Sequence, residues 1–118
     1  MYQRHVTGKN GEEIAEDYLK RLGYKILERN FLCRQGEIDI VALDKNEIVI
    51  TEVKTRTSTK YGTPAEAVGF KKQKHLYNTA KYYLYKRNLE KEFVRFDVIE
   101  VFIENEKATI NHIKKAIV

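Results

Sequence analysis

Two apolar segments separated by only two residues constrain the fold of this chain most strongly. They run from Glu37 to Leu43 and from Glu47 to Lys54, are rich in β-branched residues and are bounded by turn-forming residues. If Lys45-Asn46 is the loop of a hairpin, Asp44 pairs with Glu47, and the residue numbers of every further pair have the same sum. The pattern therefore predicts a hairpin that is apolar on both faces near its turn and polar only at the far end of one face.

The same register assigns each side chain of the hairpin to a face. Directly opposed residues share a face, with Cβ atoms about 5 Å apart. We expect one face to carry Glu37, Asp39, Val41, Leu43, Ile48, Ile50, Glu52 and Lys54, and the other to carry Ile38, Ile40, Ala42, Val49, Thr51 and Val53. Asp39 is then directly opposite Glu52, whereas a slip of one residue would move Asp39 to the other face.

The polar end of the first face brings like charges together. Opposed carboxylates destabilise a sheet unless a cation offsets their repulsion. Two carboxylates on rigid strands suit a hard divalent ion such as Mg²⁺, which prefers oxygen ligands. Lys54 returns to the face of Glu52, where it could orient the water that hydrolyses a phosphodiester bond. The alternative is a solvated strand end, at which Lys54 simply pairs with the acids.

The composition favours one soluble domain with a polyanionic partner. The chain has 118 residues, enough for a single modest core, so we expect one domain over residues 1–118. No apolar run approaches the roughly 20 residues of a membrane span, and the N-terminus lacks the apolar stretch of a signal peptide. A single cysteine, Cys33, excludes an internal disulfide and fits a cytoplasmic location. The formal net charge of +5 is typical of proteins that bind polyanions such as nucleic acids.

The remaining segments predict helices and strands around the hairpin. Apolar periodicity and turn residues predict helices at 8–22 and 70–87, a short helix opened by the capping box 63–66, strands at 24–30 and 94–103, and an edge strand at 109–113. The order α-β-β-β-α-β-β predicts a three-layer α/β fold, in which helices flank a central mixed sheet.

Two further polar residues are candidates for the site. Glu12 lies in the first turn of the first helix and could lean over the polar end of the hairpin as a third acid, or it could only complement the helix dipole. Gln73 lies at the start of the long helix, where its amide could hold a scissile phosphate or the attacking water. A capping or surface role is the alternative for Gln73.

Basic residues surround the proposed acids in the sequence. Lys71, Lys74 and Lys81 form one stripe of the long helix, and Arg56 and Lys60 lie in the preceding loop. Such side chains give affinity for phosphates regardless of base sequence, although a lysine-rich helix face can also be plain solvated surface. The chain has no zinc-type histidine spacing, glycine-rich phosphate loop or nucleophile elbow, which sets nucleotide hydrolysis by those routes aside.

Taken together, the motifs of this chain resemble those of one bacterial family. The motifs are Gly8-x-x-Gly11-Glu12-x-x-Ala15-x-x-Tyr18-Leu19, Asn30, Gly36-Glu37-Ile38-Asp39, Glu52-Val53-Lys54-Thr55-Arg56, Gly62-x-Pro64-x-Glu66-Ala67-Val68 and Arg95-Phe96-Asp97-Val98. They resemble the UPF0102 (YraN-like) family, which is similar to the archaeal Holliday-junction resolvases. Both groups belong with the restriction-endonuclease-like nucleases, whose signature is an acid followed by (Asp/Glu)-x-Lys.

The resemblance implies a fold, a site and an activity. It implies a restriction-endonuclease-like fold with Asp39 and Glu52 as metal ligands and Lys54 as the catalytic lysine. Glu12 corresponds to a glutamate that completes the acidic cluster of the resolvases, and Lys72 or Gln73 matches polar residues of the later helix. Because resolvase relatives act as homodimers, a homodimer is one expected assembly.

The resulting hypothesis is a Mg²⁺- or Mn²⁺-dependent DNA endonuclease that acts on branched or otherwise non-standard DNA. Asp39, Glu52, the backbone carbonyl of Val53 and Glu12 are the expected metal ligands, Lys54 positions the hydrolytic water, and Gln73 assists. The residues expected to dock the DNA backbone are Arg56, Lys60, Lys71, Lys72 and Lys74. The alternative is a non-catalytic nucleic-acid-binding module with the same fold, whose binding would be indifferent to divalent metal.

Overall fold

The computed structural model describes residues 2–6, 8–56 and 70–117. Over these residues the elements are β1 (Tyr2–His5), α1 (Gly11–Arg21), β2 (Lys25–Cys33), β3 (Gly36–Asp44), β4 (Glu47–Arg56), α2 (Phe70–Lys86), β5 (Phe93–Glu104) and β6 (Lys107–Ile117). The predicted short helix at 63–66 and the predicted DNA-binding residue Lys60 lie outside the described residues. Neither described helix has the length and apolar composition that crossing a membrane requires.

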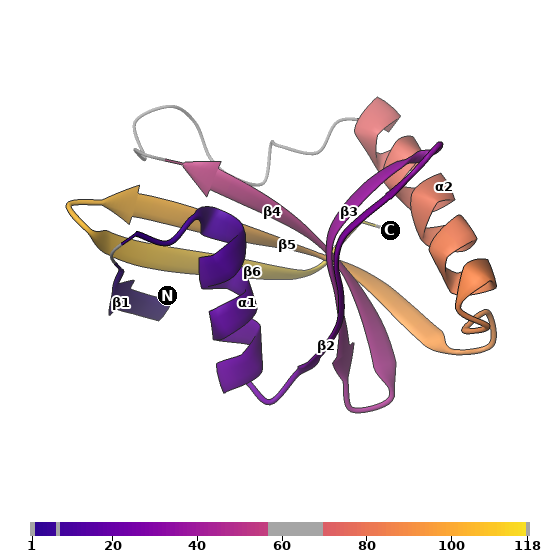
Figure 1. Ribbon diagram of the computed structural model, residues 1–118, viewed down its shortest axis with the longest axis horizontal. Helices are drawn as coiled ribbons and strands as arrows, with labels where there is room; N and C mark the ends of the chain where they lie inside the picture. The colour runs from indigo at the N-terminus through magenta and orange to yellow at the C-terminus, as the bar shows by residue number, and fades with distance from the viewer. Residues whose placement is uncertain (1, 7, 57–69, 118) are drawn as a thin grey trace.

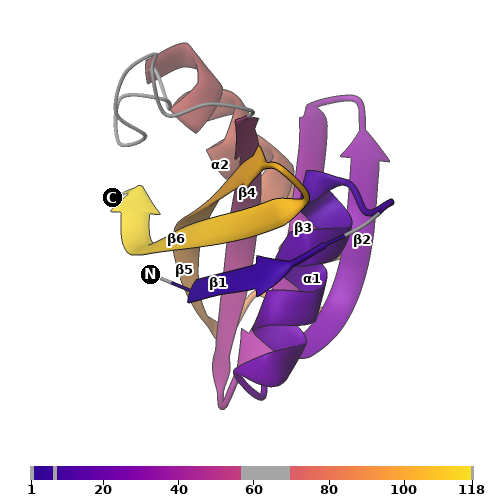
Figure 2. The ribbon, with the colours of Figure 1, turned by 90° about the vertical axis from the view of Figure 1, so that its left-hand side faces the viewer.

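One sheet holds all the described strands together. Their order across the sheet is β1-β6-β5-β4-β3-β2 (Figure 2). The β4–β5 pair is parallel, and every other neighbouring pair is antiparallel. A parallel pair requires a long crossover connection, and α2 forms part of the connection between β4 and β5. The predicted three-layer α/β architecture with a mixed central sheet is thus confirmed, and it is compatible with a restriction-endonuclease-like fold.

The N-terminal strand β1 was missing from the predicted order of elements, and this changes one edge of the sheet. β1 pairs with β6 from Tyr2↔Ile110 to His5↔Lys107. The predicted edge strand at 109–113 is therefore wrong in position, because β6 lies between β1 and β5. β6 (Lys107–Ile117) is also longer than the predicted strand, and it pairs with β1 on one side and with β5 on the other.

The register predicted for the central hairpin is confirmed from Asp44 to Ile40, but the paired stretch ends before the predicted Asp39–Glu52 pair. The Cα partners of β3 and β4 run from Asp44↔Glu47 to Ile40↔Thr51, and the residue numbers of each pair have the predicted constant sum. Lys45, the first residue of the loop, adopts the left-handed conformation with φ 58°, which suits a two-residue connection between antiparallel strands.

The sheet buries a separate apolar cluster on each face. The first cluster joins Ile14, Ala15 and Leu19 of α1 to Ile40, Ala42, Val49, Ile99, Val101, Ala108 and Ile110 of the sheet. The second joins Leu76, Ala80 and Tyr83 of α2 to Phe31, Ile38, Val41, Ile48 and Ile50. Because β3 and β4 contribute to both clusters, their side chains are apolar on both faces. Tyr77, which follows Leu76 in α2, is 54% exposed and lies outside this cluster.

The alternation of side chains along β3 is interrupted at Asp39. Ile38 packs in the α2 cluster although Ile40 packs in the α1 cluster, so the face predicted for Ile38 is wrong. The pairing of β2 with β3 passes from Arg29↔Ile40 to Phe31↔Ile38, and Asn30 between them has a left-handed φ of 52°. The two strands therefore turn together at this level. Figure 1 shows β2 and β3 curving toward α2, whereas β4 continues in another direction.

Helix α1 begins three residues later than predicted, because Asn10 caps it. The Asn10 side chain accepts the backbone N–H of Glu13, and the Glu13 carboxylate accepts the N–H of Asn10 in return. This reciprocal capping box fixes the first turn of the helix. Gly23, with φ 91°, ends the helix as predicted, in the left-handed conformation that favours glycine after a C-cap.

A buried polar network ties the start of β5 to neighbouring elements. Arg95 donates hydrogen bonds to Asp97, Asp44, Glu47 and the hydroxyl of Tyr24. Asp97 also contacts the His112 ring at 2.7 Å and accepts the backbone N–H of residue 115. Burial raises the pKa of the Asp97 carboxyl, but the hydrogen bonds from His112 and Arg95 outweigh it, so that the pKa is lowered. The charges in this network are therefore compensated within the protein.

Gly11 lets the start of α1 approach β4 closely. A Cβ atom at residue 11 would lie 1.9 Å from the Thr55 hydroxyl oxygen. We expect Gly11→Ala to lower the free energy of unfolding by about 1–3 kcal/mol, the usual cost of overpacking, which urea denaturation would measure. Combining it with Thr55→Ala, which removes the clashing hydroxyl, should recover part of the loss. Equal stability of Gly11→Ala and the wild type would contradict this close packing.

Candidate metal centre

A polar cavity opens where β3 and β4 separate beneath α2. It has a volume of about 430 Å³. The strands supply Gly36, Glu37, Asp39, Glu52 and Val53 to its lining, and α2 supplies Lys72, His75, Leu76 and Thr79. Asp39 and Glu52, which sequence analysis predicted to share a face, therefore line the same cavity.

The carboxylate of Asp39 is fixed by the backbone of the neighbouring strand. Its Oδ2 atom accepts the N–H of Val53 at 2.8 Å, and the side chain is almost completely buried. Burial raises the pKa of Asp39 most, the Val53 hydrogen bond lowers it, and the charges of Glu52 and Glu12 raise it again, to about 7. The site thus holds a carboxyl group whose ionised form would gain from a nearby cation.

Three carboxylates from two elements, that of Asp39 among them, lie close together. One carboxylate oxygen each from Glu12, Glu37 and Asp39 lies within 4.8 Å of the other two. Glu12 reaches this point because α1 starts directly over the strands, and its carboxylate lies 3.6 Å from the Arg29 guanidinium of β2. Arg29 also forms an ion pair with Glu16, so one cation holds two carboxylates of the same helix face.

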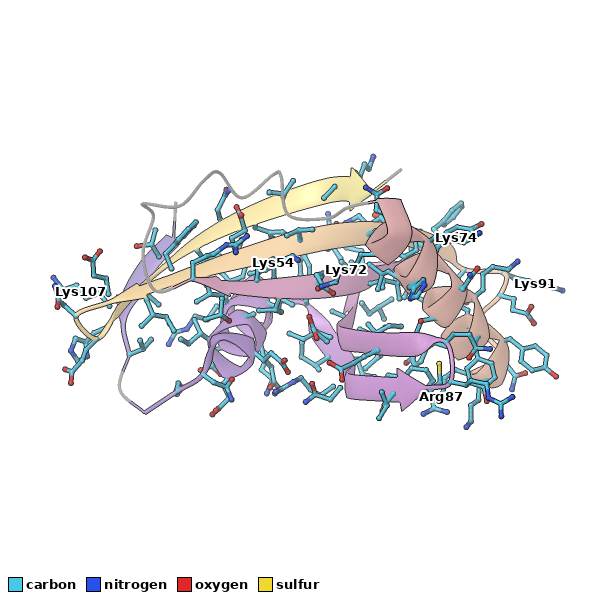
Figure 3. The ribbon with its side chains drawn as sticks, turned by 90° about the horizontal axis from the view of Figure 1, so that it is seen from above. Lys54, Lys72, Lys74, Arg87, Lys91 and Lys107 are labelled. Atoms are coloured by element: carbon cyan, nitrogen blue, oxygen red, sulfur yellow. The ribbon has the colours of Figure 1, made fainter. Side chains whose placement is uncertain are left out.

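Glu52 lines the same cavity as Asp39 and already has cationic partners. Its Oε1 atom lies 2.6 Å from the Lys72 ammonium of α2 and 3.9 Å from that of Lys54. Figure 3 shows Lys54 and Lys72 close to each other near the start of α2. Burial and the adjacent Lys72 charge lower the pKa of Lys54, whereas the bond to Glu52 raises that of Lys72.

The remaining predicted site residues lie at different distances from this centre. Gln73 is half-buried in the first turn of α2. The described lining of the cavity includes its neighbour Lys72 but not Gln73 itself. Arg56 is the last residue of β4, and Lys74 is exposed on α2, along the helix from Lys72 (Figure 3). Lys71 is the second residue of α2. The structure thus places Glu12 with Asp39, and Glu52 with Lys54 and Lys72. Asp39, Glu52 and Lys72 line one cavity, whereas Gln73 and Lys74 are not part of its described lining.

Sequence analysis did not assign a role to two residues of this centre. Glu37 lies on the predicted polar face of the hairpin but not among the predicted ligands, and the sequence predicts no role for Arg29. The signal for Glu37 was its spacing of two from Asp39 in Gly36-Glu37-Ile38-Asp39, which keeps two residues of a strand on one face. No sequence signal identifies Arg29, because its contacts with Glu12 and Glu16 come from packing of α1 beside β2.

The donor set of the centre fits a hard divalent cation. Oxygen ligands from Glu12, Glu37, Asp39 and Glu52 suit Mg²⁺ or Mn²⁺ better than softer metals. In the cluster of Glu12, Glu37 and Asp39, Glu37 is exposed, and exposed acidic groups often gather without an ion, but Asp39 and the cavity residue Glu52 are buried. Lys72 already places a positive charge 2.6 Å from Glu52. This ion pair indicates that a positive charge next to the buried carboxylate of Glu52 is favourable.

The raised pKa of Asp39 predicts an unusual effect of pH on stability. In the unfolded chain this carboxyl ionises at its ordinary pKa of 3.8, but in the folded, metal-free protein it ionises at about 7. The folded state therefore binds the proton more tightly, and stability falls as the pH rises from 4 to 7.

We expect Asp39→Asn, which cannot ionise but can still accept the Val53 N–H, to be more stable than the wild type above pH 7 in EDTA. The gain should be about 2 kcal/mol and should shrink toward pH 4. Urea denaturation at pH 5 and pH 8 measures it. Glu104→Gln, at the exposed end of β5, is the control that should leave the stability unchanged at both pH values. A gain independent of pH would contradict the assignment to Asp39.

The comparisons with known proteins identify a family. The model of the uncharacterised protein family UPF0102 matches residues 11–101. The chain is 49% identical over 116 residues to a UPF0102 protein of Caldanaerobacter subterraneus subsp. tengcongensis, covering 96% of this chain and 95% of the relative. It is 53% identical over 118 residues to a UPF0102 protein of Clostridium botulinum, covering 98% and 96%. A UPF0102 protein of Caldicellulosiruptor saccharolyticus is 48% identical over 115 residues, covering 96% and 98%. The chain therefore belongs to the UPF0102 family.

Proposed function

We propose that this protein is a divalent-metal-dependent DNA endonuclease, related to the restriction-endonuclease-like nucleases and the Holliday-junction resolvases. One observation carries the proposal. Asp39 and Glu52 line one cavity, Lys54 approaches Glu52, and the Asp39 carboxylate is further clustered with Glu12 and Glu37. Acids and a lysine brought together on neighbouring strands, under a helix that carries basic residues, suit the hydrolysis of a phosphodiester bond.

Each residue has a distinct role in this proposal. Asp39, Glu52, the backbone carbonyl of Val53 and Glu12 would hold Mg²⁺ or Mn²⁺, and Glu37 extends this set. The bound cation would supply positive charge against the phosphate and make a coordinated water more acidic. Lys54 would hold the hydrolytic water. Its lowered pKa brings the amine closer to the neutral form that accepts a proton.

The surroundings of the cavity favour a nucleic acid as substrate. Lys74 is exposed on α2, Lys72 lines the cavity, and Arg56 ends β4. Cations in these positions can bind successive backbone phosphates. Branched or otherwise non-standard DNA is the proposed substrate class, and a homodimer would place one site on each of the two strands cut at a two-fold junction.

The cleavage assay is the direct test of this function. Purified protein with Mg²⁺ or Mn²⁺ should cut junction, flap or linear DNA, and RNA substrates of the same shapes define the specificity. Lys54→Met should slow cleavage about 100-fold or more, the usual contribution of a proton-transferring group, and Asp39→Asn should do the same. Lys107→Met, which removes a charge at the far end of the molecule (Figure 3), is the control. No cleavage of any substrate, or cleavage undiminished in both variants, would contradict the proposal.

Metal binding is tested separately by calorimetric titration. We expect Mn²⁺ to bind the metal-free protein, Asp39→Asn to lose this binding, and Glu52→Gln to weaken it, because each variant removes a carboxylate ligand. Binding of DNA that is salt-sensitive but unchanged by EDTA and by Glu52→Gln would favour the non-catalytic nucleic-acid-binding module instead.

A further inference from the structure

The closest charge pair at the cavity joins α2 to β4. The ammonium of Lys72 lies 2.6 Å from Oε1 of Glu52, while the ammonium of Lys54 lies 3.9 Å from the same oxygen. Two lysines from different elements therefore share one carboxylate oxygen. A divalent cation that bound Glu52 would compete with both of them for that oxygen.

The two lysines differ in their freedom to move. The side chain of Lys54 is 15% exposed and belongs to the central strand β4, whereas that of Lys72 is 52% exposed and belongs to the first turn of α2. A half-exposed lysine has several accessible rotamers and a flexible stem. Lys72 can therefore leave Glu52 without a change of the backbone, and Lys54 has much less room to do so.

The position of Lys72 in its helix calls for an explanation other than helix stability. The first turn of α2 contains no acidic residue, and a lysine there opposes the positive end of the helix dipole. The unfavourable placement is offset by Glu52 in the structure described above. The same end of a helix, together with a lysine, also attracts an anion such as a phosphate.

We propose that Lys72 is an exchangeable counter-cation, which neutralises Glu52 in the metal-free protein and moves to the scissile phosphate when a divalent cation occupies the carboxylates. This inference rests on the proposed nuclease function and assigns Lys72 a positioning role within it. The exchange keeps the charge of the buried carboxylate compensated at each stage. It also makes the phosphate-binding lysine available only in the metal-loaded state.

The test compares metal binding with cleavage in matched variants of the full chain. Calorimetric titration with Mn²⁺ alone is done on the wild type, Lys72→Met, Lys72→Arg and Lys91→Met. Lys91 is an exposed lysine well away from Lys72 (Figure 3) and serves as the charge-matched control. Loss of the competing ammonium should tighten Mn²⁺ binding by Lys72→Met about tenfold. Lys72→Arg, which keeps the competing charge, should show no such gain, and Lys91→Met should match the wild type.

A second measurement follows the lysine itself. In protein labelled with ¹³C and ¹⁵N at lysine, the side-chain NMR signal of Lys72 should shift as Mg²⁺ is added, while that of Lys91 stays unchanged. DNA cleavage by Lys72→Met at saturating Mn²⁺ should be slower than in the wild type despite its tighter metal binding. A purely structural role for Lys72 would not produce opposite effects on metal affinity and cleavage.

The outcomes separate this inference from the function on which it rests. Equal Mn²⁺ affinity of Lys72→Met and the wild type, with binding lost in Asp39→Asn, would overturn the exchange and leave the nuclease proposal standing. Tighter metal binding with undiminished cleavage would reject the transfer of Lys72 to the phosphate. Failure of the wild type and every variant to bind Mn²⁺ or to cut DNA would overturn both proposals.

Discussion

The hydrogen bond from the Val53 N–H to the Asp39 carboxylate joins the fold of this protein to its site. Backbone pairing between β3 and β4 ends at Ile40↔Thr51, and one residue further the Asp39 side chain accepts the N–H that a paired strand would otherwise satisfy. β3 is therefore free to turn with β2 toward α2, and the cavity lies in the space between the separating strands. Because the Val53 N–H donates to the Asp39 carboxylate and not to a backbone carbonyl of β3, the β3–β4 pairing ends here with an acidic side chain at its end.

This arrangement concentrates negative charge at a point where few groups can compensate it. Glu12 has Arg29 and Glu52 has Lys72. Asp39 accepts the Val53 N–H and lies beside acids, and the charge of Lys72 also acts on it although the ion pair of Lys72 is with Glu52. A backbone N–H is a dipole and not a full charge, so it offsets the cost of ionising Asp39 only in part. The shape of the sheet thus leaves buried carboxylates with too little positive charge around them. Lys72 offsets part of this negative charge, and a bound metal ion would offset the rest.

The sequence was sufficient to predict this site wherever its geometry is local. The two-residue loop at Lys45-Asn46 determined the register of the hairpin from Asp44↔Glu47 to Ile40↔Thr51. Extending this register by one pair predicts that Asp39 and Glu52 lie near each other, and both line one cavity. The capping side chain of Asn10 and the break at Gly23 are local signals too, and they delimit α1 closely. Prediction failed where another strand or helix decides the outcome.

Ile38 illustrates such a failure at the level of packing. Its face depends on the turn that β2 and β3 make together, which coincides with the left-handed conformation of Asn30 in the other strand. The pairing of Lys72 with Glu52 likewise depends on where α2 packs over the sheet, because the two residues belong to different elements whose relative placement no local pattern determines. β1 escaped prediction since four mostly polar residues show no strand periodicity, and its pairing with β6 defines it. Periodicity reports what a segment buries, but it does not report which partner covers it.

Two buried aspartates show how the fold separates a structural acid from a chemical one. Asp97 is fully buried and Asp39 nearly so, and burial alone would raise the pKa of both. Asp97 receives Arg95, His112 and a backbone N–H, and its pKa is lowered, while the pKa of Asp39 rises to about 7 beside Glu52 and Glu12. Burial therefore does not distinguish them, and the sign of the surrounding charge does. Asp97 is thus compensated within the protein by an arginine and a histidine, whereas Asp39 lies among acids, an arrangement that supports the proposed metal site. The two motifs that contain these residues therefore have different roles. Arg95-Phe96-Asp97-Val98 holds β5 to its neighbours, whereas Gly36-Glu37-Ile38-Asp39 belongs to the chemistry proposed for this protein.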